Sequence, residues 1–69
     1  MTTIAATING HERRLTAGTT LRGLLDELSL EPVRVAVEVN RELVRRAELD
    51  QTVVGDGDRI EIVTFVGGG

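Results

Sequence analysis

The chain has 69 residues, a net charge of −3, a single phenylalanine as its only aromatic residue, and no cysteine. This length holds one domain with a small core, and no disulfide or cysteine-ligated metal is available to stabilise it. The acidic balance argues against the basic, aromatic face that nucleic-acid binding usually needs. No apolar run approaches the roughly 20 residues of a membrane span, and no basic and apolar leader begins the chain, so we expect an untargeted cytoplasmic protein with no membrane partner.

The first segment reads as a β-hairpin. Residues 3–8 alternate, with apolar side chains on one face at Ile4, Ala6 and Ile8. Asn9-Gly10 follows, and both residues tolerate the positive φ of a type I′ turn. Residues 11–15 are polar except for Leu15, which suits an exposed edge strand whose register the pattern leaves open.

A short helix is predicted next. Thr19 or Thr20 can cap its N-terminus, and one apolar stripe follows at i, i+3, i+4 and i+7, made of Leu21, Leu24, Leu25 and Leu28. Pro32 disfavours helical geometry at the residue before it, so we expect the helix to end around Ser29.

The second half of the chain reads mainly as strands. Valines alternate through residues 33–39 and predict a strand with one face buried. Residues 42–44 can form a short strand, and residues 45–51 a turn or a single helical turn. Asp56-Gly57-Asp58 is a turn signal, and residues 59–66 are mostly β-branched or aromatic, as a last strand prefers.

Three glycines, Gly67, Gly68 and Gly69, follow this last strand. Glycine loses the most backbone entropy on ordering, so we expect residues 1–66 to form the domain and residues 67–69 a flexible tail. Extended, three residues reach about 10 Å, enough to enter a partner's active site. The terminal carboxylate of Gly69 is the only reactive group on such a tail.

One helix covering one face of a mixed four- to five-stranded sheet is the economical way to bury this pattern, an α+β fold of the β-grasp type with the last strand central. The chain resembles the ThiS family of ubiquitin-like sulfur carriers in Val37-Glu38-Val39-Asn40 with Glu42-Leu43-Val44, in residues 56–63, and in Phe65-Val66-Gly67-Gly68-Gly69. The sister family, the small subunit of molybdopterin synthase (MoaD), often carries Pro-Pro-Val before its glycines. Here Thr64-Phe65-Val66 stands instead, which favours ThiS. ThiS-like chains often have proline where Arg45 stands and an aromatic residue where Leu49 stands.

The resemblance implies that the chain is a cosubstrate rather than an enzyme, with no catalytic residue, metal site or permanent cofactor of its own. A ThiF-like adenylating enzyme would activate the Gly69 carboxylate using ATP and Mg²⁺. A persulfide supplied by a cysteine desulfurase would then convert it to a thiocarboxylate. The recipient implied is thiazole synthase, in thiamine biosynthesis.

A docking surface beside the tail is expected at Val63, Phe65 and Val66. If Ile60 and Ile62 face the core, alternation places Val63 and Phe65 on the other face. An exposed aromatic side chain there would be a natural interface anchor.

The other candidate residues give weaker evidence of a functional site. His11 has no second ligand beside it in the sequence, and we interpret Arg45-Arg46 as a solvated pair. Two alternatives stay open for the chain as a whole. One is a sulfur carrier of the MoaD type or of another pathway, and the other is a β-grasp interaction module whose glycine tail is inert.

Overall fold

The structure is a computed structural model that describes residues 2–65. Within this range the five strands and the α-helix follow one another in the predicted order, and two 3₁₀ turns lie between them. Their bounds are β1 Thr3–Ile8, β2 His11–Thr16, α1 Leu21–Glu27, η1 Pro32–Arg34, β3 Val35–Val39, β4 Glu42–Val44, η2 Arg46–Glu48 and β5 Arg59–Thr64. The single helical turn expected within residues 45–51 is η2.

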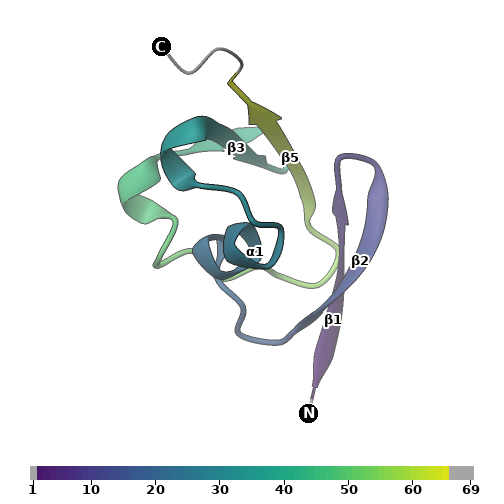
Figure 1. Cartoon of the computed structure of the whole chain (residues 1–69). Coiled ribbons are helices and arrows are strands. Elements are labelled where there is room, and N and C mark those ends of the chain that lie inside the picture. Colours follow the sequence, from purple (N-terminus) through teal and green to yellow (C-terminus); the bar gives the residue numbers. More distant parts are fainter. Residues whose placement is uncertain (1, 66–69) are drawn as a thin grey trace.

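The five strands form one mixed sheet in the order β2-β1-β5-β3-β4. The last strand, β5, is central: it pairs parallel with β1 and antiparallel with β3. Figure 1 shows α1 lying across one side of this sheet, with β5 rising toward the end of the molecule opposite the start of β1. The mixed sheet with one helix on one face, and the central position of the last strand, are therefore confirmed.

The core lies between α1 and the sheet. The leucine stripe of α1 is fully buried at Leu21, Leu24 and Leu25, and it packs on inward-facing side chains of four strands. Leu49 and Val54, from the long connection between β4 and β5, close the core. Among residues 2–65, the buried apolar residues are Ala6, Ile8, Leu15, Leu21, Leu24, Leu25, Val35, Val37, Leu49, Val54, Ile60 and Ile62. Burial on one side of the sheet leaves its other side for contacts outside the domain.

Helix α1 begins as predicted and ends earlier. The Thr20 hydroxyl accepts a hydrogen bond from Gly23 N at 3.1 Å, which makes Thr20 the N-cap. The last helical residue is Glu27, not Ser29. Ser29 instead has a φ of 59°, and the amide of Leu30 reaches back to the carbonyl of Leu25 at 2.9 Å. This is a Schellman C-cap with serine in the left-handed position that usually holds glycine.

The predicted start of the third strand was wrong. Pro32, Val33 and Arg34 form the 3₁₀ turn η1, and β3 begins only at Val35. Pro32 occupies the first turn, where its fixed φ is suitable, and Arg34 N donates to Glu31 O at 2.9 Å. Val33 is consequently 56% exposed, although its place in the alternation matched the buried Val35 and Val37.

Candidate functional site

Side chains from two turns, the β3–β4 turn and the turn before β5, hold the start of β5 in place. Asp56 Oδ1 accepts from Ala5 N at 2.9 Å, and Asp58 Oδ2 accepts from Gly55 N at 2.7 Å. Asn40 accepts from Arg59 N at 3.0 Å through Oδ1 and donates to Asp58 Oδ1 at 3.1 Å. The turn predicted at the Asp-Gly-Asp segment is confirmed, and these hydrogen bonds fix the start of the strand that precedes the glycines.

The far end of β5 is held by backbone pairing with β3. The register joins Val63 to Ala36 and Thr64 to Val35, and beyond the last strand residue Phe65 N donates to Arg34 O at 2.8 Å. The strand therefore ends at Thr64, two residues before the predicted end at residue 66. Val66, Gly67, Gly68 and Gly69 lie outside the described residues.

The two described residues of the expected docking surface are both exposed. Val63 is 60% exposed and Phe65 is 51% exposed, whereas Ile60 and Ile62 are buried on the helix side. Alternation along β5 thus divides its side chains as expected, inward at even positions and outward at odd ones. A docking surface requires large apolar side chains that are exposed to solvent, and Val63 and Phe65 provide them beside the end of the central strand.

Two further residues extend this surface, and the sequence analysis missed them. Leu43 of β4 is 67% exposed and pairs with Glu38, and Ala36 of β3 pairs with Val63. Leu43 and Ala36 therefore lie, with Val63, on the side of the sheet away from α1. Leu43, Ala36 and Phe65 also line one shallow recess of about 170 Å³. We call Ala36, Leu43, Val63 and Phe65 the apolar patch. The sequence did not place Leu43 on this surface, because the three residues of β4 are too few for alternation to show which face a side chain is on.

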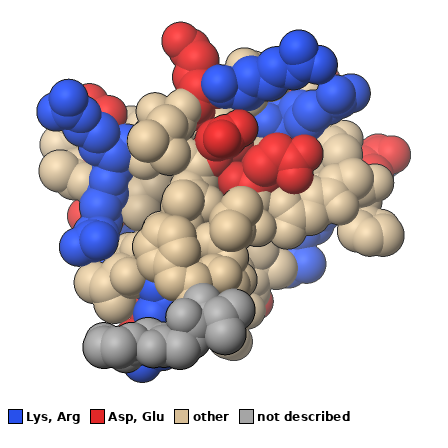
Figure 2. Space-filling view, turned by 90° about the horizontal axis from the view of Figure 1, so that it is seen from above, with Lys and Arg blue, Asp and Glu red and all other residues tan. Residues whose placement is uncertain are grey.

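Two glutamates lie on the same side of the sheet as the patch. Glu38 and Glu61 are direct cross-strand partners, and both are exposed. Among residues 2–65 neither glutamate makes an ion pair. Seen from the end of the molecule where β5 finishes, a broad uncharged area separates basic side chains at the left from acidic and basic ones at the top (Figure 2).

The remaining candidates do not gather into a site. His11 is exposed at the start of β2, and within residues 2–65 no three His, Cys, Asp or Glu side chains are placed to hold a metal ion. Over the same residues, no helix has the length and apolar character needed to cross a membrane. Within residues 2–65, exposed apolar side chains and a recess lie together beside the end of β5, the strand that precedes the glycines in the sequence.

Strand order β2-β1-β5-β3-β4 with one helix across one face defines a β-grasp domain of the ubiquitin-like type. The model of the ThiS family matches residues 6–69, so the match includes the three glycines. The chain belongs to the ThiS family.

Solved and curated relatives agree with this assignment. A thiamine biosynthesis protein (ThiS) from Geobacter metallireducens superposes with a TM-score of 0.81 at 33% identity, covering 96% of this chain and all of that one. The sulfur carrier protein ThiS of Thermus thermophilus is 37% identical over 62 residues, which is 90% of this chain and 95% of the relative. A thiazole synthase of Paramagnetospirillum magneticum is 48% identical over 62 residues, 90% of this chain but only 19% of that protein. The chain thus spans about a fifth of the length of that relative.

Proposed function

We propose that this chain is a sulfur carrier whose Gly69 carboxylate becomes a thiocarboxylate and donates its sulfur to the thiazole ring of thiamine. The observation that carries the proposal is the family match that runs through residues 67–69, on a chain whose central strand leads directly to them. The sulfur carrier of Thermus thermophilus and the thiazole synthase of Paramagnetospirillum magneticum are both similar to this chain, and this similarity supports the thiazole as the recipient of the sulfur.

The chemistry needs two steps before sulfur can be donated. A carboxylate is a poor electrophile, so an adenylating enzyme of the ThiF type joins it to the α-phosphate of ATP, with Mg²⁺ and release of pyrophosphate. A persulfide sulfur then attacks the acyl carbon, and AMP leaves. Two thiol equivalents then reduce the S–S bond of the resulting acyl disulfide and become a disulfide themselves, which releases the donor cysteine as a free thiol and leaves the thiocarboxylate on Gly69. A cysteine desulfurase is the source of the persulfide.

Glycine suits these steps because of what it lacks. Without a Cβ, residues 67–69 can pass through a narrow channel, and Gly69 has no stereocentre that activation could racemise. In this scheme the carrier supplies the reacting carboxylate and its partners supply the catalysis, so the chain is a cosubstrate.

The apolar patch gives the partners a surface to hold while the tail reaches their active sites. Leu43, Val63 and Phe65 are each at least half exposed and lie within one side of the sheet or at its end. Interface energy concentrates in such apolar and aromatic anchors when a partner removes them from water. We propose that the adenylating enzyme binds here, through Val63 and Phe65 with Val66.

Intact-mass spectrometry tests the proposal. The full chain is incubated with a ThiF-like enzyme, ATP, Mg²⁺, a cysteine desulfurase, cysteine and a thiol reductant. The expected product has gained the mass difference of one sulfur atom over one oxygen atom, and fragmentation places that gain on Gly69. Deleting Gly69 should abolish the product and leave the circular dichroism spectrum unchanged.

The other outcomes separate the alternatives. An unchanged mass in the presence of an enzyme that thiocarboxylates a second ThiS protein would mean that the tail is inert. A thiocarboxylate that transfers sulfur to a molybdopterin precursor, and not to thiazole synthase, would place the chain in the MoaD pathway.

A further inference from the structure

The turn between β1 and β2 consists of Asn9 and Gly10, two residues that can react with each other. The side-chain amide carbon of asparagine is an electrophile, and the backbone nitrogen of the next residue can attack it. Glycine has no Cβ to hinder that nitrogen. Both residues are exposed, so water reaches them. The other asparagine of the chain, Asn40, is followed by arginine, so Asn9-Gly10 is the pair best suited to spontaneous deamidation.

Deamidation passes through a cyclic imide. The lone pair of Gly10 N attacks Cγ of Asn9, that nitrogen gives its proton to the solvent, and the Cγ–Nδ2 bond breaks as Nδ2 takes up a proton and leaves as ammonia. Water that adds at Cγ opens the ring to aspartate. Water that adds at the backbone carbonyl carbon gives isoaspartate, in which the main chain runs through Cβ and Cγ. In total one water is consumed and one ammonia is released, and nothing is oxidised or reduced.

The fold holds the electrophile away from this reaction. Asn9 Nδ2 donates to Ile62 O at 3.1 Å, and Asn9 Oδ1 accepts from Ile62 N at 2.7 Å. Asn9 N also donates to Ile60 O at 2.9 Å. Ring closure needs Cγ to swing onto Gly10 N, which breaks both side-chain hydrogen bonds to Ile62. Deamidation of the folded chain therefore has to wait until the hairpin turn opens away from β5.

A second pair of the same kind is held more completely. Asp56 precedes Gly57, and an aspartate can close the same ring when its carboxyl group loses water. Gly57 N donates to Ala5 O at 2.7 Å, and Asp56 Oδ1 accepts from Ala5 N at 2.9 Å, so the nucleophile and the electrophile are both occupied. Gly10 N, in contrast, donates to no other group of residues 2–65. At Asn9-Gly10 only the side chain of asparagine is restrained, so this is the pair that reacts when the turn opens.

We infer that Asn9 is a modification site at which deamidation, restrained by the hydrogen bonds to Ile62, releases β5 from the hairpin turn. In the aspartate product a carboxylate oxygen replaces Nδ2 and faces Ile62 O, so a donor and an acceptor become two acceptors. In isoaspartate the additional main-chain carbon also moves the carboxylate. Either product weakens the contact between the turn and the strand that precedes the glycines. The inference does not rest on the proposed function, because the reaction needs no partner protein.

Mass spectrometry of the full chain tests the site and its protection. The chain is kept in mildly alkaline buffer, either folded or denatured in guanidinium chloride, and is then digested and sequenced by fragmentation. A hydroxyl group in place of an amino group should appear at Asn9, at least about tenfold faster in the denatured chain, and not at Asn40. In denaturant, where the fold has no part, Gly10→Ala should slow the reaction at least about tenfold because its Cβ crowds the attacking nitrogen.

Hydrogen exchange tests the effect on β5. Asn9→Asp supplies the aspartate product as a uniform sample, and NMR compares amide exchange at Ile62 with exchange at Leu25 in the buried face of α1. The ratio of the two exchange rates should rise at least about fivefold in Asn9→Asp, because the turn opens locally. Thr20→Ala is the control, since it destabilises the domain through the cap of α1 and should leave this ratio within about twofold.

The contrary results are distinct. Absence of deamidation at Asn9 in the denatured chain would overturn the site. Equal rates in the folded and denatured chains would show that the hydrogen bonds to Ile62 protect nothing. An unchanged exchange ratio in Asn9→Asp would overturn the release of β5. None of these measurements uses an adenylating enzyme, so they stand or fail separately from the formation of a thiocarboxylate.

Discussion

The side chain of Asn9 hydrogen-bonds to both backbone polar groups of Ile62, which lies 53 residues away. Its Nδ2 donates to Ile62 O at 3.1 Å and its Oδ1 accepts from Ile62 N at 2.7 Å. The parallel register between β1 and β5 contains only two residue pairs, Thr7 with Arg59 and Ile8 with Ile60. Asn9 therefore extends this pairing by one step, from a turn residue with a φ of 50°. One asparagine both closes the hairpin and holds the central strand.

Replacing Asn9 by alanine should lower the free energy of unfolding by about 2 kcal/mol, because two part-buried backbone groups lose their partners and alanine disfavours a positive φ. Asn9→Gly keeps the turn geometry and loses only the hydrogen bonds, so its loss should be smaller. Urea unfolding followed by circular dichroism measures both. If Asn9→Ala and Asn9→Gly lost the same free energy of unfolding, the positive φ at residue 9 would contribute nothing to the cost of the alanine variant.

Ser29 occupies the left-handed position of the helix C-cap, with a φ of 59°. A side chain in that conformation costs about 1 kcal/mol relative to glycine. Ser29→Gly should therefore raise the free energy of unfolding by about that amount, whereas Ser29→Ala should not. Thermal and urea unfolding provide the test. A glycine variant less stable than the parent would mean that the serine side chain contributes to the cap in solution.

Phe65→Ala should reduce kcat/KM for adenylation at least tenfold while changing the free energy of unfolding by less than about 1 kcal/mol, since the ring is 51% exposed. Leu43→Ala, on the same patch, should act in the same direction. Val53→Ala is the matched control, since Val53 is 56% exposed away from the patch. Pyrophosphate release measures the rate. If the loss in the free energy of unfolding equalled the loss in activation free energy calculated from kcat/KM, Phe65 would be identified as a structural residue.

Glu38 and Glu61 are direct cross-strand partners of like charge on the open side of the sheet. Such a pair destabilises a sheet by about 0.2 to 1 kcal/mol, so Glu61→Gln should raise stability by a few tenths. The gain should shrink in about 1 M salt, where the Debye length is near 3 Å. Glu12→Gln is the control, because Glu12 pairs with the neutral Thr7. A decrease in stability for Glu61→Gln would show that the carboxylate has a favourable contact in this face.

The local elements of this fold follow from the sequence because neighbours along the chain decide them. Alternation identified β1 and the buried side of β5, the Asn-Gly pair identified the hairpin, and the two threonines Thr19 and Thr20 marked the start of α1, of which Thr20 is the cap. The prediction failed where two local preferences competed. Alternating valines suggested a strand from Val33, but Pro32 supports a 3₁₀ turn, and the turn prevailed. The family resemblance, carried by short motifs and the glycines, was equally readable from the sequence.

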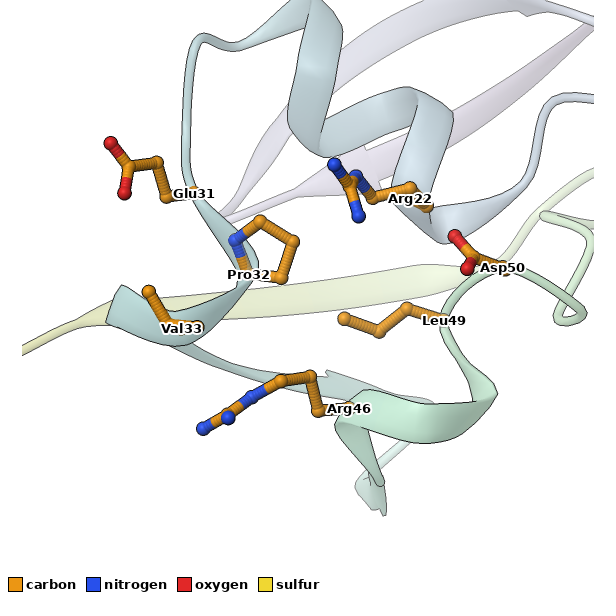
Figure 3. Close-up of a pocket in the computed structure, with 7 residues that line it drawn as sticks. All are labelled: Arg22, Glu31, Pro32, Val33, Arg46, Leu49 and Asp50. Atoms are coloured by element: carbon orange, nitrogen blue, oxygen red, sulfur yellow. The ribbon is translucent and has the colours of Figure 1, made fainter.

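The contacts between distant segments were decided only by the tertiary structure. Nothing near Asn9 indicates that it reaches Ile62, because that depends on the crossover that brings β5 beside β1. Leu43 joins Ala36 and Phe65 because of the register of β4 on β3. Pro32 of η1 and Arg46 of η2 line common recesses, the larger of which is shown in Figure 3, because packing across the whole chain brings these two turns together. Local preferences act over a few residues, whereas these surfaces arise from strand register and packing across the whole chain.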